Sequence, residues 1–266
     1  MNDMPDRIRV PKATPVFIRD AIAFRLGRGR TGGSTLLDIV VQLARRDGRE
    51  VIVGDGDRRN PTLAALYPPG QPGGAFVPPT DDTQDMKDWI TGLIGQAIEG
   101  RSSLVLDLSG GDTFLQDYGR DLALVPFCET QGLNPVALFT TGPEMDDYEH
   151  VLKIWRAGYF RPKRAVLVLN EHLVMQGRTP AGAFNAIMAR PEGRELGAAG
   201  LKVMVMPRLP CMAEVRKSGL SFLDAAAGKP GPDGRPFNPV RRFMVSQWVQ
   251  RVQEEIASIG AAEWMP

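Results

Sequence analysis

Residues 21–35 read AIAFRLGRGRTGGST, and this stretch decides the class of fold that the chain adopts. Its first six residues are mostly apolar and predict a buried strand. The glycines at 27, 29, 32 and 33 let the backbone turn sharply and bring its N–H groups close to a ligand. Apolar residues then recur at helical spacing over 34–46. A strand, a glycine loop and a helix in this order predict an anion site, because the positive end of the helix points at the loop.

The remainder of the chain repeats the alternation of strand and helix. We expect further strands at 50–53, 103–108, 136–139, 165–169 and 201–206, and further helices at 83–99, 114–127, 145–155, 180–190, 213–227 and 240–259. Two segments rich in Pro and Gly, 68–80 and 229–239, predict loops. Such alternation is typical of an α/β fold with a mostly parallel sheet between two helix layers. We expect a tail over residues 1–16 and a single domain over 17–266.

Composition excludes several classes of protein. The chain has 266 residues, of which 43% are hydrophobic and 24% charged, as in a soluble globular protein. A net charge of +1 gives no global field that would attract nucleic acid or an anionic membrane. Cys128 and Cys211 are too few for a disulfide framework, and His150 and His172 stand outside any zinc motif. We find no membrane-length apolar run and no secretory signal, so we expect a cytoplasmic location.

The glycine loop admits two interpretations from its residues alone. Gly27, Gly29 and Gly32 satisfy the dinucleotide pattern G-x-G-x-x-G, and Asp55 follows at a spacing suited to a ribose-binding acid. In the second interpretation the loop is a P-loop that wraps phosphates, with Ser34 offering its hydroxyl to Mg²⁺. Gly33 then stands where a working P-loop carries lysine.

Residues 28–35, RGRTGGST, resemble the deviant Walker A loop of the ParA/MinD family, which usually reads KGGTGKST. In this comparison Arg28 falls on the signature lysine of the family and Arg30 replaces a glycine. Gly33 replaces the catalytic lysine, whereas Ser34 and Thr35 match. The resemblance implies a degenerate member of the family with a P-loop NTPase-like fold.

Further segments carry the same resemblance in the same order along residues 21–259. Residues 51–63, VIVGDGDRRNPTL, are similar to the second motif of the family, a strand ending in D-x-D. Residues 104–107, LVLD, with the following LSGG, resemble a Walker B strand and its switch II loop. Residues 166–170, VLVLN, and 203–208, VMVMPR, resemble the strand that ends in an adenine-contacting Asn and the last strand with its proline loop.

The resemblance implies a magnesium and catalytic set at the strand ends. Ser34 would be a metal ligand and Asp107 would hold a magnesium-bound water. Asp55 would lie near the metal or support the loop. Asp57 would place the attacking water, although its Asp-Arg-Arg-Asn-Pro context also suits a turn.

The resemblance also implies contacts to ATP. Arg28 would reach across a dimer to the phosphates of the partner, and a guanidinium offers phosphate two hydrogen bonds at once. Asn170 would contact adenine or simply cap its strand. The implied nucleotide-binding residues are Gly29, Arg30, Thr31, Gly32, Gly33, Ser34, Thr35, Asn170 and Pro207.

The implied function is an ATP- and Mg²⁺-dependent dimerising switch that positions or partitions cargo such as plasmid DNA, or supports DNA transfer, with an adaptor protein. The missing lysine leaves hydrolysis weak or absent, and it leaves open a scaffold that binds no nucleotide and an NAD-binding oxidoreductase. Nonspecific DNA binding or a solvated surface would account for the basic residues Arg156, Arg161, Lys163, Arg164, Arg241 and Arg242.

Overall fold

The structure is a computed structural model that describes residues 20–108 and 112–266. For residues 112–114 it describes the backbone only. The tail expected over residues 1–16 lies outside the described residues. The glycines of the expected switch II loop, at 110 and 111, also lie outside them.

The described strands form a single parallel sheet in the order β2-β3-β1-β4-β5-β6, which confirms the expected α/β class. Every strand predicted from the sequence is present, with ends that differ by at most two residues. The strands are β1 (Ala21–Leu26), β2 (Val51–Asp55), β3 (Ser103–Asp107), β4 (Asn134–Thr141), β5 (Arg164–Asn170) and β6 (Lys202–Met206).

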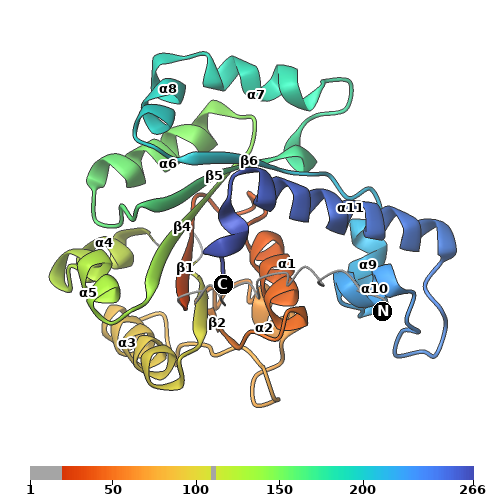
Figure 1. Cartoon of the computed structure of the whole chain (residues 1–266), viewed down its shortest axis with the longest axis horizontal. Helices are drawn as coiled ribbons and strands as arrows, with labels where there is room; N and C mark the ends of the chain where they lie inside the picture. Colours follow the sequence, from red (N-terminus) through yellow and green to blue (C-terminus); the bar gives the residue numbers. More distant parts are fainter. Residues whose placement is uncertain (1–19, 109–111) are drawn as a thin grey trace, which may run out of the picture.

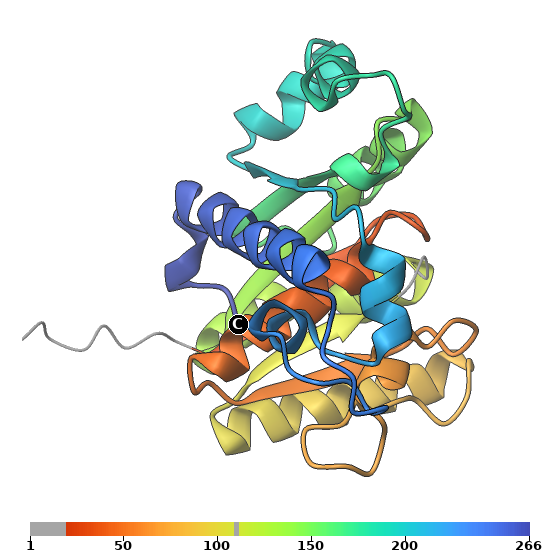
Figure 2. The same ribbon diagram turned by 90° about the vertical axis from the view of Figure 1, so that its right-hand side faces the viewer.

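Helices cover both faces of the sheet and make a three-layer α/β/α architecture (Figures 1 and 2). One apolar cluster packs beneath α3 (Thr83–Gly100), α4 (Asp112–Asp121), α5 (Leu124–Thr130), α6 (Met145–Ala157), α7 (Pro180–Met188) and α8 (Pro191–Ala198). The other packs beneath α1 (Gly33–Arg46), α2 (Thr62–Leu66), α9 (Met212–Ser218), α10 (Phe222–Ala227) and α11 (Pro239–Ser258). Short 3-10 helices follow at Glu171–Leu173 and Ala261–Glu263. Among the described residues, none of these helices combines the length and the apolar character that crossing a bilayer requires.

Two predicted helices are each divided into two. The helix expected over 114–127 is interrupted where Ala123 adopts a left-handed conformation with φ of 49°. The helix expected over 213–227 ends at Gly219, whose φ of 68° closes α9 before α10 begins. Helices α2 and α8 were not predicted, because five and eight residues are too few to establish an apolar periodicity.

The strand order bears on the dinucleotide interpretation of the glycine loop. In a dinucleotide-binding fold the strand after the first helix lies beside the first strand. Here β1 pairs with β3 and β4, and β3 separates β1 from β2. Asp55, the expected ribose-binding acid, therefore lies two strands from the loop rather than on the neighbouring strand.

The long helix α11 is anchored to the sheet edge by Trp248. The indole is 2% exposed, lies 4.6 Å from the ring of Phe222 between centroids, and donates from Nε1 to the carbonyl oxygen of Pro207 at 2.7 Å. This bond joins α11 to the loop that follows β6.

We predict that Trp248→Phe lowers the free energy of unfolding by about 2 kcal/mol, because a buried carbonyl loses its donor and the core loses apolar area. Urea denaturation measures the change. Trp264→Phe, at a half-buried tryptophan, is the matched control and should cost less than about 1 kcal/mol. Equal losses in the two variants would contradict an anchoring role for the Pro207 bond.

Candidate functional site

The glycine loop lies at the carboxyl edge of the sheet, between β1 and the first residue of α1. Gly27 has φ of 130°, and a Cβ there would lie 2.5 Å from the carbonyl oxygen of Thr140. Gly32 has φ of 86°, and its Cβ would lie 2.2 Å from the Asn170 amide nitrogen. Both positions therefore require glycine, which confirms the sharp turn expected from the sequence.

Arg25 lies beneath this loop, and the sequence analysis did not identify it. Its side chain is buried, with 3% of the residue exposed, although it belongs to an otherwise apolar strand. One terminal nitrogen donates to the carbonyl oxygen of Arg28 at 2.5 Å and to Thr31 Oγ1 at 2.7 Å, and Nε donates to Thr140 Oγ1 at 3.2 Å. A lone charge in a buried strand beside a glycine loop was the sequence signal that could have revealed it.

Gly33 and Arg25 are sterically complementary. A Cβ at position 33 would lie 1.8 Å from Arg25 Nε and 2.6 Å from Cζ, well inside contact distance. No larger residue fits at position 33 while Arg25 keeps this conformation. Glycine at position 33 therefore leaves the space that the Arg25 side chain occupies. The missing lysine and the buried arginine belong to the same packing arrangement.

Ser34 and Asp107, for which the resemblance implied a common metal site, lie in contact. Ser34 Oγ donates to Asp107 Oδ2 at 2.6 Å, and the other carboxylate oxygen lies 4.0 Å from Arg25 Nη1. Asp107 ends β3 and is 2% exposed, whereas Ser34 is half-buried in the first turn of α1. In the described part of the chain, no group of three or more His, Cys, Asp or Glu side chains is arranged to hold a metal.

Asp55 supports the loop after β2. Its carboxylate accepts from the backbone N–H of Asp57 at 3.1 Å and from that of Ala64 at 2.8 Å, and only 1% of the residue is exposed. Burial raises the pKa of Asp55 to about 6, and the neighbouring charge of Asp107 adds to the rise. These contacts are those of a residue that supports its loop. A place for Asp55 near magnesium remains a prediction.

Asp57 forms a turn. Its carboxylate accepts from the backbone N–H of Asn60 at 3.0 Å, and its carbonyl oxygen accepts from the same N–H at 3.2 Å, which fits the turn chemistry of Asp-Arg-Arg-Asn-Pro. Its role in placing an attacking water remains a prediction.

The two loop arginines lie on the surface in different environments. Arg28 is paired with Asp147 at 3.3 Å and Asp146 at 3.7 Å, both in the first turn of α6. Arg30 is exposed and has φ of 66°, in the left-handed region that favours glycine. Surface pairs of this kind contribute little energy, so Arg28 is available to exchange its partners.

The remaining predicted binding residues surround the loop. Asn170 is 4% exposed, donates from Nδ2 to the carbonyl oxygen of Thr31 at 2.9 Å, and accepts from the His172 N–H at 3.0 Å. Its amide thus ties the loop to β5 and caps the short 3-10 helix that follows β5, and a contact to adenine remains a prediction. Gly29 is exposed, Thr35 is half-buried, and Pro207 is buried under α11.

Most of the basic residues considered for DNA have partners within the chain. Arg156 binds Glu195 with contacts of 3.1 and 2.6 Å, and Arg241 pairs with Glu214 at 3.0 Å. Arg161 lies over the ring of Trp155, and Arg164 donates to Asn134 Oδ1 at 2.6 Å. These contacts fit the interpretation of these basic residues as part of a solvated surface.

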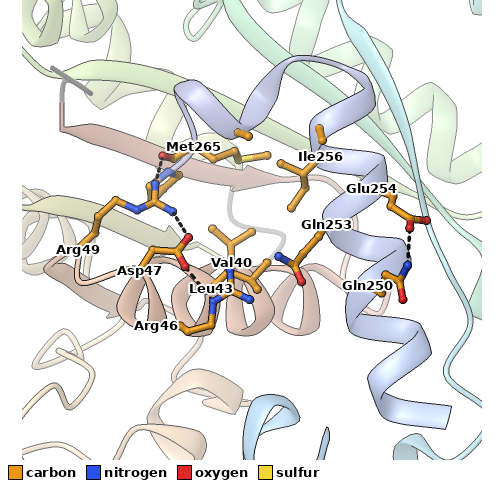
Figure 3. Close-up of a pocket in the computed structure, with 13 residues that line it drawn as sticks. Val40, Leu43, Arg46, Asp47, Arg49, Gln250, Gln253, Glu254, Ile256 and Met265 are labelled. Atoms are coloured by element: carbon orange, nitrogen blue, oxygen red, sulfur yellow. Dashed lines mark hydrogen bonds and ion pairs between the residues drawn. The ribbon is translucent and has the colours of Figure 1, made fainter. Parts of the chain in front are cut away.

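A cavity of about 430 Å³ lies at the opposite end of α1 (Figure 3). Val40, Leu43, Ile256 and Met265 form apolar parts of its lining, and Arg49 at its edge donates to the carbonyl oxygen of Met265 at 2.9 Å. Ligands of parallel sheets bind at the carboxyl ends of the strands, which is the end where α1 begins. This cavity is therefore separate from the loop site.

The sequence matches no protein family and no curated protein. Among solved structures, the MinC:MinD cell division protein complex of Aquifex aeolicus is similar with 12% identity and a TM-score of 0.49, covering 88% of this chain and 96% of that one. The signal recognition particle receptor FtsY of Elizabethkingia anophelis has 12% identity and a TM-score of 0.44, covering 86% of this chain. Chloroplast FtsY of Physcomitrella patens has 15% identity and a TM-score of 0.47, covering 88% of this chain.

The chain spans 65% of the length of each of these two FtsY chains. Similarity at this level concerns the arrangement of strands and helices and says nothing of the ligand. The α/β class of the fold rests on the parallel sheet and its flanking helices, and the ligand has to be argued from the loop itself.

We predict that Arg30→Gly raises the free energy of unfolding by about 1 kcal/mol, since relief of the left-handed strain outweighs the extra freedom of the unfolded chain. Arg30→Ala is the matched control, because it removes the charge but keeps the Cβ and its strain. Urea denaturation of both variants measures the difference. A stability of Arg30→Gly at or below that of Arg30→Ala would contradict the assigned backbone conformation.

We predict that the Asp55 carboxyl titrates with a midpoint near pH 6, measured from its carboxyl carbon by NMR. The folded chain then holds this proton more tightly than the unfolded chain. The resulting contribution to stability is fully present below about pH 4 and is lost as pH rises through about 6. Asp107→Asn should lower the midpoint by removing a like charge. A wild-type midpoint at or below about 4 would contradict the burial argument.

Proposed function

We propose that this chain is a nucleotide-dependent switch protein that binds ATP and Mg²⁺ at the loop of residues 28–35. The observation that carries the proposal is the contact of 2.6 Å between Ser34 Oγ and Asp107 Oδ2 at the carboxyl edge of the sheet. A hydroxyl in the first turn of a helix and a carboxylate at the end of a neighbouring strand are the two groups that a P-loop uses around magnesium.

These residues suit a magnesium ion held mainly by its substrate. Mg²⁺ keeps several waters and takes few protein ligands beside phosphate oxygens, so a dedicated cluster of acids is not required. Ser34 would be the direct ligand, and Asp107 would hold a metal-bound water. The ion would supply positive charge that neutralises the phosphates. The start of α1 would favour the same negative charge.

The switch would act through a homodimer. Arg28 sits on the loop, and its pairs with Asp146 and Asp147 leave its side chain 47% exposed. Exchange of these carboxylates for a phosphate of the partner would gain a charge-assisted, bidentate contact. With glycine at position 33, we infer slow or absent hydrolysis, and Asp57 would place the water in any residual reaction.

The cargo follows from the family resemblance alone. We propose that the dimer positions or partitions plasmid DNA, or supports its transfer, together with an adaptor protein. Direct, nonspecific DNA contact is the weaker part of this proposal, because several of the basic residues are engaged within the chain.

A scaffold that binds no nucleotide is the second candidate. The observation that favours it is the Arg25 side chain, which lies beneath the turn and already donates hydrogen bonds to the loop. The two candidates differ in one measurable property, which is saturable binding of a nucleotide.

We predict saturable binding of ATP in the presence of Mg²⁺ by calorimetry, with ADP, GTP and NAD as comparison ligands. Ser34→Ala should weaken ATP binding by about tenfold with Mg²⁺, or about 1.4 kcal/mol, and have little effect without it. Ser258→Ala, which removes an exposed hydroxyl on α11, is the matched control.

Each outcome has a distinct meaning. Saturable binding of NAD with no binding of ATP would favour the oxidoreductase, although the strand order differs from that of a dinucleotide-binding fold. Absence of binding by every nucleotide would favour the scaffold. Equal ATP affinity of Ser34→Ala and wild type with Mg²⁺ would remove Ser34 from the metal site.

A further inference from the structure

We propose that Arg25 supplies, from strand β1, the phosphate-binding cation that Gly33 fails to supply from α1. The ligand class is the phosphate chain of a nucleoside triphosphate. This inference rests on the nucleotide binding proposed above and deepens it, because it assigns the missing positive charge to a residue outside the loop motif.

The position of the side chain is the first argument. Ala21 and Ala23 belong to the apolar cluster beneath α1, and the two-residue period of a strand puts Arg25 on the same face. Its Nε lies 1.8 Å from the point where the first side-chain carbon of residue 33 would be. The guanidinium therefore occupies the beginning of the space that a lysine at position 33 would use.

The hydrogen-bond partners are the second argument. The guanidinium donates to the Arg28 carbonyl at 2.5 Å and to the hydroxyls of Thr31 and Thr140 at 2.7 and 3.2 Å. All three acceptors are neutral, and two belong to the loop that would wrap the ligand. Phosphate oxygens are stronger acceptors for a guanidinium, because both groups are charged. A phosphate entering the loop can thus replace the Arg28 carbonyl at favourable energy.

The burial of the charge is the third argument. A guanidinium stays protonated in proteins, so Arg25 keeps its charge although it is 3% exposed. Its ion pair with Asp107 is long, at 4.0 Å, and Asp107 also accepts the Ser34 hydroxyl at 2.6 Å. A buried charge is costly unless a strong partner compensates it. A phosphate beside the start of α1 would provide that compensation.

The three arguments together explain why the chain combines an arginine at 25 with a glycine at 33. Either residue alone would be a defect, since lysine at 33 would collide with Arg25 and alanine at 25 would leave the site without its inner cation. A swap of the two positions tests this directly.

The experiment compares wild type, Arg25→Ala, Gly33→Lys and the double variant Arg25→Ala/Gly33→Lys. Calorimetry measures binding of ATP and of tripolyphosphate, each with Mg²⁺, and thermal melting without ligand measures folding. Arg25→Ala should weaken binding of both ligands by at least about tenfold, the loss expected for one charge-assisted contact. Gly33→Lys alone should melt at a lower temperature, whereas the double variant should regain most of the affinity for both ligands.

Two further variants serve as controls. Arg49→Ala removes a part-buried guanidinium beyond the other end of α1 and should leave binding unchanged. Arg25→Met keeps the unbranched stem without the charge and replaces Arg25→Ala if that variant does not fold. Recovery in the double variant distinguishes a phosphate-binding charge from a structural one, because a structural arginine would not be replaced by a lysine on another element.

Three results would overturn the inference. Wild-type affinity in Arg25→Ala would do so while leaving the proposed nucleotide binding intact. Tighter binding in Arg25→Ala would identify the guanidinium as a plug that competes with the ligand. Lack of ATP binding in wild type would refute the proposed function and this inference together.

Discussion

A single buried positive charge organises the carboxyl edge of this sheet. The guanidinium of Arg25 holds the loop at Arg28 and Thr31, reaches Thr140 at the end of β4, and faces Asp107 at the end of β3. Because desolvating a charge is expensive, these contacts have to be present together, and each fixes the position of a neighbouring element. The glycine at the start of α1 is part of the same constraint, since it makes room for the side chain.

The strand order determines which carboxylates lie beside the loop. Placing β3 between β1 and β2 puts Asp107 beside the loop and directly opposite Asp55 in register. Asp55 is satisfied by two backbone N–H groups, while Asp107 receives the Ser34 hydroxyl. Two carboxylates on adjacent strands thus differ in their environment, since one is bound by the backbone of its own loop and the other by a side chain of the glycine loop.

The sequence predicted the strands and the glycine turn, because these follow from local patterns of apolar residues and glycine. The Ser34–Asp107 pair was implied by the family resemblance and not by such a pattern. The sequence did not reveal Arg25, since the contact with Gly33 depends on how β1 and α1 pack rather than on spacing along the chain. The break at Ala123 was missed for a related reason: alanine favours helix, and its left-handed conformation is imposed by the surroundings. Whether Asn170 meets adenine likewise depends on packing, and its amide is bound to the loop and to His172.

The tie between Asn170 and the Thr31 carbonyl has a mechanical consequence. Any ligand that turns the Thr31 peptide must either break this bond or pull Asn170 with it. The next residue, Glu171, accepts from the Arg208 N–H at 3.1 Å and pairs with Arg251 of α11 at 3.6 Å. A short, continuous chain of contacts therefore joins the turn to α11, through Asn170 and Glu171.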